Sequence, residues 1–251
     1  MNKPPAFTLE GRNLVFDALS TDKTVEKIFV SKKSKEDQKV KIIIRLAQKK
    51  GVPVSFVNPR YLAVISRSAN HQGVIGIAGA STPATTTLNQ LLTQKEAKGE
   101  DPFLLLFNRL DYEQNLGAIL RSAWGAGVDA VIVPPQGVHE ITPVVARASM
   151  GGSLHVPLIV QSLFQSLKTI KDHAIPVVGV DMRKGHVYSD ITLRGPVAFV
   201  LGGEDSGVSD ALANYCDIFV HIPMDESIPS LNVSVSAALV MFEKVRQERS
   251  K

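Results

Sequence analysis

From residue 103 onward, short runs of consecutive apolar residues alternate with longer stretches that show helical periodicity. A strand that is apolar at every position is typical of a sheet with helices on both faces, because neither side of the strand meets water. Parallel strands need crossover connections, so the alternation predicts an α/β fold with a mostly parallel sheet. The expected strands are residues 103–107, 130–133, 156–160, 177–180, 197–201 and 218–222, and the expected helices include 115–126, 142–149, 210–214 and 233–246.

The first 78 residues predict a second, smaller α/β unit. Helical and strand patterns alternate there over residues 11–19, 25–30, 40–50, 53–57, 58–66 and 74–78. Residues 80–87 are mostly Ala, Ser and Thr, a composition typical of a linker, and a helix is expected at 88–98. We therefore predict domains at residues 1–79 and 103–251, joined by a linker at 80–102.

Positive charge is concentrated in the first part of the chain. Residues 1–79 contain 14 Lys and Arg against 6 Asp and Glu, whereas the remaining residues contain 14 against 18. A basic unit joined to a mildly acidic one suggests that the first contacts a polyanion and that the second has a different role. The alternative is a solvated lysine surface without a partner.

Composition disfavours several classes of protein. No apolar run approaches the roughly 18 residues that a membrane-spanning helix needs, and no long apolar stretch follows residues 1–5, so we expect neither a membrane protein nor a secretory signal. Cys216 is the sole cysteine, which excludes an internal disulfide, and the scattered histidines lead us to expect no metal site. We expect a cytoplasmic protein.

Two of the expected strands end in polar segments that a generic domain does not need. Gly202–Gly207 follows the strand at 197–201, and a loop over residues 223–232 follows the strand at 218–222. Glycines at the end of a strand let the backbone bend tightly and let a ligand approach it. Ligands of open α/β sheets bind at the carboxyl ends of strands, so both segments are candidate binding loops.

A Gly-x-Gly-x-x-Ala pattern at residues 125–130 does not indicate a dinucleotide site. That fingerprint has to follow a strand and open a helix, whereas here it closes a helix and precedes a strand. We interpret it as a helix C-cap turn. The chain also lacks the Gly-x-x-x-x-Gly-Lys sequence of P-loop NTPases, which argues against that class.

Three segments together resemble the SpoU/TrmH family of RNA 2′-O-ribose methyltransferases, within the SPOUT class. They are Asn115–Ala123, Leu201–Gly207 and Ile222–Val235, which stand in the family's order and at its approximate spacing, and the resemblance covers about residues 103–248. The segments at 11–19 and 71–73 resemble a small substrate-binding domain, related to ribosomal protein L30e, that precedes the catalytic domain in the family's ribosomal RNA branch.

The resemblance implies a C-terminal SPOUT-type domain whose mostly parallel sheet is tied into a deep trefoil knot. It also implies a homodimer, packed through the helix at 115–126 and the C-terminal helix. S-adenosyl-L-methionine is implied as the cofactor, bound in a bent shape within the knot. The residues that match the family's cofactor loops are Leu201, Gly202, Gly203, Ile222, Met224 and Leu231.

The resemblance further implies catalytic roles for Asn115, Arg121, Glu204, Ser230 and Asn232. Arg121 matches an arginine placed at the ribose 2′-oxygen, which has been proposed as a base. Because arginine stays protonated in proteins, we favour phosphate binding and stabilisation of a developing alkoxide. We expect Asn115 to fix the loop before its helix or to contact the ribose, and Glu204 to orient Arg121 or Asn232. Ser230 and Asn232 would shape the site.

Each of these residues except Arg121 also has a structural interpretation. Asn115, Ser230 or Asn232 can cap a helix, and Glu204 can be a favourable acid at a helix N-terminus. The sequence also departs from the family at two places. Tyr112–Gln114 replaces the usual Asp-Pro-x, and Glu226 stands where a glycine would allow close approach or positive φ.

The expected function is methylation of a ribose 2′-hydroxyl in large-subunit ribosomal RNA of the 23S type, because the family's minimal tRNA enzymes lack the N-terminal domain. An antibiotic-resistance methyltransferase is a variant of this interpretation. The alternatives are a tRNA 2′-O-methyltransferase and a non-catalytic RNA-binding or ribosome-assembly factor on the same scaffold. The joint presence of the five candidate catalytic residues argues against the second alternative, and Glu226 argues for it.

Overall fold

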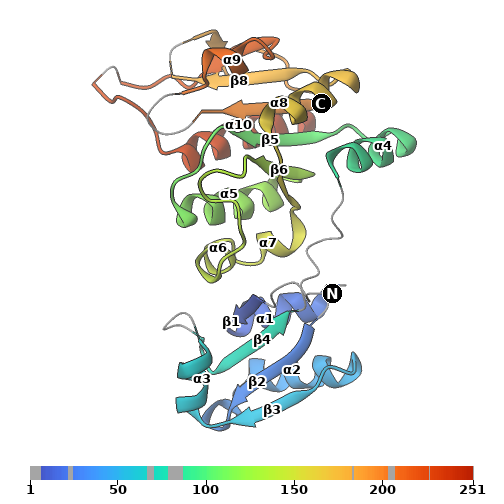
Figure 1. Ribbon diagram of the computed structural model, residues 1–251, viewed down its shortest axis with the longest axis vertical. Coiled ribbons are helices and arrows are strands. Elements are labelled where there is room, and N and C mark those ends of the chain that lie inside the picture. Colours follow the sequence, from blue (N-terminus) through green and yellow to red (C-terminus); the bar gives the residue numbers. More distant parts are fainter. Residues whose placement is uncertain are drawn as a thin grey trace. The chain divides into compact units, whose positions relative to one another are not determined.

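Figure 1 shows a computed structural model of the 251-residue chain. The structure describes residues 7–21, 25–66, 71–78, 87–182, 184–202, 207–225 and 227–250. The chain divides into two compact units, which are described separately below. Unit 1 comprises Met1–Ala84 and Ile141–Leu154, and unit 2 comprises Thr85–Glu140 and His155–Lys251.

Unit 1 is built on a four-stranded sheet with the order β1-β4-β2-β3. Its elements along residues 7–78 are β1 (Phe7–Glu10), α1 (Arg12–Ser20), β2 (Val25–Ser31), a 3₁₀ turn (Lys32–Ser34), α2 (Gln38–Lys49), β3 (Val54–Val57), α3 (Pro59–Ile65) and β4 (Val74–Ala78). β4 pairs antiparallel with β1 and β2, whereas β2 and β3 are parallel. The α/β character predicted for this part of the chain is confirmed.

The strands of unit 1 present their side chains alternately to the two faces of the sheet. Ile28 and Val30 of β2 are fully buried and pack in one core with Leu14 and Val15 of α1. Residues of α2 join the same core, and Asp37 caps this helix by accepting hydrogen bonds from the backbone N–H groups of Lys39 and Val40. α1 and α2 therefore pack on one face of the sheet and bury the side chains of Ile28 and Val30.

Unit 2 contains a seven-stranded sheet with the order β7-β6-β5-β10-β8-β11-β9, in which all the neighbouring strands are parallel. The strands are β5 (Phe103–Phe107), β6 (Ala130–Val133), β7 (Leu158–Val160), β8 (Val177–Asp181), β9 (His186–Val187), β10 (Val197–Leu201) and β11 (Ile218–His221). The predicted parallel sheet is confirmed, whereas the trefoil knot stays a prediction.

Helices pack on both faces of the large sheet (Figure 1). From residue 88 onward, the helices of unit 2 are α4 (Leu88–Lys98), α5 (Glu113–Ala126), α8 (Leu163–Asp172), α9 (Asp210–Ala213) and α10 (Val233–Arg249). α6 (Pro143–Ala148) belongs to unit 1, where it contacts β1, and α7 (Gly152–His155) ends at the boundary of that unit. Leu104 and Leu106 point into a core formed with α4, α8 and α9. Phe103 points to the other face, where the Nζ of Lys244 from α10 lies 5.3 Å from its ring centroid.

One expectation about a helix boundary is wrong. The helix expected to start at Asn115 starts at Glu113, with Tyr112 as its N-cap, so Asn115 lies inside the helix and does not cap it. Of the two candidate caps for the last helix, Asn232 is the N-cap and Ser230 is not. The turn at residues 125–130 is a helix C-cap as predicted, with Gly127 in the left-handed conformation at φ 76°.

No helix among the described residues has both the length and the apolarity needed to cross a bilayer.

Candidate functional site

Three neighbouring strands of unit 2 end at the same edge of the sheet. In the parallel pairing, Leu201 of β10 lies beside Val180 of β8, and Asp181 of β8 lies beside His221 of β11. The loops that follow these strands therefore open next to one another. The two candidate binding loops predicted from the sequence, which follow β10 and β11, therefore begin on either side of the segment that follows β8.

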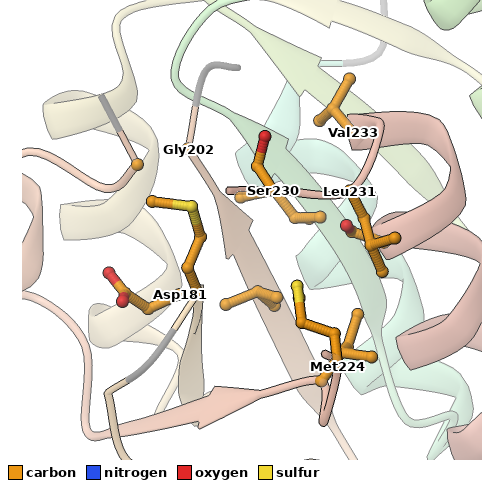
Figure 2. Close-up of a pocket in the computed structure, with 12 residues that line it drawn as sticks. Asp181, Gly202, Met224, Ser230, Leu231 and Val233 are labelled. Carbon is orange, nitrogen blue, oxygen red and sulfur yellow. The ribbon is translucent and has the colours of Figure 1, made fainter. Parts of the chain in front are cut away.

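The three loops and the start of α10 enclose a cavity (Figure 2). Its lining residues are Val180, Asp181, Met182, Leu201, Gly202, Gly207, Ile222, Met224, Ser230, Leu231, Val233 and Ser236. The predicted cofactor residues Leu201, Gly202, Ile222, Met224 and Leu231 are all among them, and so is Ser230. Gly203 and Glu204 lie outside the described residues, as does Glu226.

Asp181 and Met182 also line the cavity, and the sequence analysis missed them. In Figure 2, Asp181 lies on one side of the cavity and Leu231 on the other. The signal that was available is the strand at 177–180, which ends at a carboxylate. The rule that ligands bind at the carboxyl ends of parallel strands applies to this strand as it does to its two neighbours.

Gly202 is a place where only glycine fits. A Cβ atom built at this position lies 1.9 Å from the carbonyl carbon of Gly207 and 2.2 Å from its oxygen. Real Cβ atoms do not approach backbone atoms so closely, and Gly207 itself has φ +61°, a conformation that side chains disfavour. The two glycines therefore bring two stretches of backbone into contact at the wall of the cavity.

A second cavity adjoins the first and shares Met182, Ile222 and Met224 with it. Asp225 contributes to its lining. The hydroxyl of Ser227 donates to Asp225 over 2.5 Å and the Ser227 N–H donates over 2.9 Å, and these bonds lower the pKa of the carboxyl group. A negative charge is therefore held beside the second cavity at neutral pH.

The lining of the two cavities has a definite chemical character. Leucine, isoleucine, valine and methionine side chains supply most of it, glycine backbone supplies one wall, and Asp181 and Asp225 supply carboxylates. Such a site suits a ligand that combines a flat apolar part with positive charge. Among the described residues there is no cluster of three or more His, Cys, Asp or Glu with the geometry to hold a metal ion.

Asn232 joins the start of α10 to α5. Its Oδ1 caps α10 by accepting from the Ser234 N–H at 2.9 Å, and the Ser234 hydroxyl donates to the same oxygen at 2.6 Å. Its Nδ2 donates to the Oδ1 of Asn115 over 3.1 Å, across 117 residues of sequence. Asn115 is only 8% exposed. Two candidate catalytic residues are thus joined by a hydrogen bond. The Asn232 side chain both caps α10 and holds the start of this helix against α5.

Arg121 differs from the other candidates in its surroundings. It is exposed on α5, and no hydrogen bond or ion pair joins its guanidinium to another described residue. Neither Arg121 nor Asn115 nor Asn232 is among the residues that line the first cavity. The predicted pairing of Glu204 with Arg121 or Asn232 stays a prediction, because Glu204 is outside the described part of the chain.

Comparison with known proteins gives matches over both parts of the chain. Residues 102–242 match the model of the SpoU rRNA Methylase family. Residues 8–84 match the family model described as RNA 2'-O ribose methyltransferase substrate binding. YacO of Bacillus subtilis, assigned to the TrmH family of tRNA/rRNA methyltransferases, is 32% identical over 94% of this chain and 94% of its own length. The 23S rRNA (guanosine-2′-O-)-methyltransferase RlmB of Shewanella oneidensis is 34% identical over 86% of this chain and 87% of its own.

The fold also has solved counterparts. The crystal structure of the SpoU methyltransferase AviRb from Streptomyces viridochromogenes, in complex with the cofactor AdoMet, superposes with a TM-score of 0.81. The match covers 98% of this chain and 92% of that chain at 22% sequence identity. At this identity the similarity bears on the fold alone.

Proposed function

Because the chain belongs to the SpoU rRNA Methylase family, we propose that it transfers the methyl group of S-adenosylmethionine to a ribose 2′-hydroxyl of large-subunit ribosomal RNA. The observation that carries this proposal is the glycine-walled cavity at the carboxyl ends of β8, β10 and β11, which lies within the matched residues 102–242. The match of residues 8–84 to a substrate-binding domain and the basic balance of that part support RNA as the substrate.

The residues of the two cavities fit S-adenosylmethionine. Its adenine ring would suit the apolar lining around Ile222 and Leu231, and the backbone groups of Gly202 and Gly207, which also line the cavity, would meet its polar edges. Its ammonium and sulfonium charges suit the carboxylates of Asp181 and Asp225. When bound, the cofactor supplies a methyl group activated by the positive sulfur.

The protein's own contribution is to position and stabilise the accepting oxygen. Orienting two reactants can lower a barrier by several kcal/mol, roughly 7–11 in favourable cases. The Arg121 guanidinium binds the phosphate next to the target ribose and stabilises the negative charge that develops on the 2′-oxygen as the hydroxyl proton passes to solvent. Asn115 and Asn232, held together by their hydrogen bond, keep the start of α10 in register with α5. Ser230 presents its hydroxyl from the wall of the cavity.

The two roles of Asn232 can be separated by substitution. In Asn232→Ser, the serine is as favourable at the N-cap position as asparagine, but its side chain is too short to reach Asn115. Asn232→Ala removes both the cap and the hydrogen bond. We expect the Ser variant to keep its free energy of unfolding within about 0.5 kcal/mol and to lose methyl transfer by about tenfold, whereas the Ala variant is also destabilised by about 1 kcal/mol. Denaturant titration and initial rates measure these quantities. Full activity in the Ser variant would show that Asn232 acts only as the N-cap of α10 and that its hydrogen bond to Asn115 is not needed for methyl transfer.

The proposed enzyme is a homodimer that packs through α5 and α10. A groove lies on these helices, lined by Ala118, Ser122, Tyr188, Ser234, Val235, Ala238, Leu239, Phe242 and Glu243. Val235 and Phe242 are two turns apart on α10 and both line the groove, and they are 47% and 46% exposed, as is typical of an apolar surface that a partner covers. A second copy of the chain would bury this groove across a twofold axis.

We expect Phe242→Glu to convert a dimer into a folded monomer, because a buried, unpaired carboxylate at the interface costs several kcal/mol. Sedimentation velocity at micromolar concentration measures the mass. The matched control is Phe164→Glu, which places the same charge at a phenylalanine of α8 that is 47% exposed and outside the groove. A monomeric wild type, or a Phe242→Glu variant that stays dimeric, would refute this interface.

Transfer of labelled methyl from S-adenosylmethionine to purified ribosomal RNA and, in parallel, to bulk tRNA tests the proposed substrate. We expect label in the large-subunit RNA, and this substrate places the activity in the cytoplasm. Label in tRNA alone would favour the tRNA enzyme, an alternative that the family name of YacO leaves open. Folded protein that binds RNA but transfers no methyl to either would favour the non-catalytic assembly factor.

A further inference from the structure

The two faces of the unit 1 sheet are covered unequally. α1 and α2 pack on the face to which Ile28 and Val30 point. In the described part of residues 7–78, the opposite face is covered by α3, a helix of seven residues whose Leu62 is fully buried. Ile75, which is paired in register with Phe29 on this face, is fully buried, whereas Phe29 and Lys27 are half-buried, so the accessible part of the face lies around these two residues.

Aromatic and basic side chains meet on that accessible face. Lys27 and Phe29 alternate with the buried residues of β2, and both are half-buried. The Phe29 ring lies 5.7 Å from the ring of Tyr61 on α3 at an angle of 54°, and the Nζ of Lys27 lies 4.9 Å from the Phe29 centroid. Tyr61 is 47% exposed, and Arg60 beside it is exposed.

The helix that carries Tyr61 is held firmly at its start. The Oδ1 of Asn58 accepts a hydrogen bond from the backbone N–H of Arg60 at 3.0 Å, and Pro59 occupies the first turn. An N-cap followed by proline is a favourable helix start with little conformational freedom. Tyr61 is therefore an exposed ring on a rigid support, which lowers the entropy lost when a flat ligand stacks on it.

We propose that this aromatic–basic face, defined by Lys27, Phe29, Arg60 and Tyr61, stacks an unpaired base of the RNA substrate and holds the adjoining phosphate. This inference rests on the proposed function, since it takes RNA as the partner of unit 1. Bases stack on exposed aromatic rings because both carry extended π surfaces, and lysine and arginine neutralise the backbone between them. The excess of positive charge over residues 1–79 provides the charge complementarity.

Other lysine–aromatic pairs of unit 1 lack this arrangement. Lys35 lies over Phe56 and Lys39 lies over Phe16, but no second aromatic ring adjoins either phenylalanine among the described residues. Phe56 is paired in register with Val30, so its side chain points to the face on which α1 and α2 pack, opposite to Tyr61. Phe56 is 40% exposed and lies next to a lysine, but it is not part of the proposed face.

The test measures RNA binding by the full-length protein with a fluorescein-labelled single-stranded oligoadenylate of about 12 nucleotides, and with an RNA duplex of the same length. Tyr61→Leu is expected to weaken binding to the single strand about tenfold, as loss of one stacked base does, and to change duplex binding less than twofold. Tyr61→Phe retains the ring and is expected to bind within about twofold of wild type. Phe56→Leu is the matched control and is expected to do the same.

Two further readouts separate stacking from a structural role. Lys27→Gln is expected to reduce the slope of log K against log salt by about 0.7, the value for one phosphate contact on a single strand. In methyl transfer, Tyr61→Leu is expected to raise the KM for RNA about tenfold and leave kcat unchanged, because the ring contributes to RNA binding and is not among the residues that line the first cavity of unit 2.

The stacking face and the proposed function fail in different ways. A Tyr61→Leu variant that binds the single strand as tightly as wild type overturns the stacking face, and so does an equal loss in Tyr61→Phe or Phe56→Leu. Failure of the proposed function looks different, because wild type then transfers no methyl to any RNA whatever residue stands at position 61. Selective loss of single-strand binding in Tyr61→Leu, with an active wild type, supports both.

Discussion

Gly202→Ala is expected to reduce the affinity for S-adenosylmethionine by about 10- to 100-fold, because overpacking of a well-packed site costs about 1–3 kcal/mol. The added Cβ would lie 1.9 Å from the carbonyl carbon of Gly207. The obstructing atoms belong to backbone, so no flexible side chain can turn away to make room. The loop on one side of the cavity has to move, and the wall that it forms moves with it. Isothermal titration with S-adenosylmethionine measures the loss.

Gly125→Ala is the matched control for this experiment. Gly125 lies in α5 with ordinary helical φ, and a Cβ there meets only the end of the Phe242 ring at 3.6 Å, an ordinary contact. Alanine also has the higher helix propensity. We expect this variant to bind S-adenosylmethionine within about twofold of wild type. Tight binding by Gly202→Ala would show that the cofactor does not use the cavity bounded by Gly202 and Gly207.

Arg121→Ala is expected to lower kcat for methyl transfer by about 100- to 1,000-fold, the usual effect of removing one group that stabilises charge in a transition state. The affinity for S-adenosylmethionine is expected to stay within about twofold, because Arg121 is not among the residues that line the cofactor cavity. Single-turnover rates with saturating RNA and cofactor, combined with titration of the cofactor, separate the two effects.

Arg121→Lys distinguishes the two roles considered for this residue. Lysine keeps the charge and loses the planar fork, so an electrostatic role predicts activity between those of wild type and the Ala variant. Arg194→Ala is a suitable control, because Arg194 precedes β10 and so lies toward the opposite edge of the sheet, where its guanidinium donates to the Ser250 carbonyl. A small effect of Arg121→Ala on kcat would remove Arg121 from the catalytic residues.

The strands of this protein are well predicted where the sequence marks both ends. β4, β5, β6 and β10 have the predicted bounds, because each is a mostly apolar run that stops at a segment rich in glycine, proline or polar residues. β9 comprises two residues and no apolar run, and it exists because His186 and Val187 pair with β11. Its formation depends on tertiary context, which periodicity does not report.

The residues that line the cavity were largely predicted, whereas their role in binding the cofactor stays a prediction, and the link between α5 and α10 was not predicted. Strand-end loops identified Gly202, Ile222 and Leu231, and the same rule applied to β8 would have found Asp181. Asn115 was expected at the helix start because asparagine is a common cap, but the helix begins at Glu113 and Asn115 bonds Asn232 instead. A contact across 117 residues is set by the packing of two helices, which no local pattern encodes.

The measurement that tests the central claim most directly is the chemical position of the transferred methyl group. Large-subunit ribosomal RNA, labelled by the protein with S-adenosylmethionine, is digested with alkali, which cleaves RNA through the 2′-oxygen and leaves linkages with a methylated 2′-oxygen intact. We expect the label in an alkali-resistant dinucleotide and its absence when Arg121→Ala replaces wild type. Label recovered in mononucleotides would place the methyl group on a base and contradict the account.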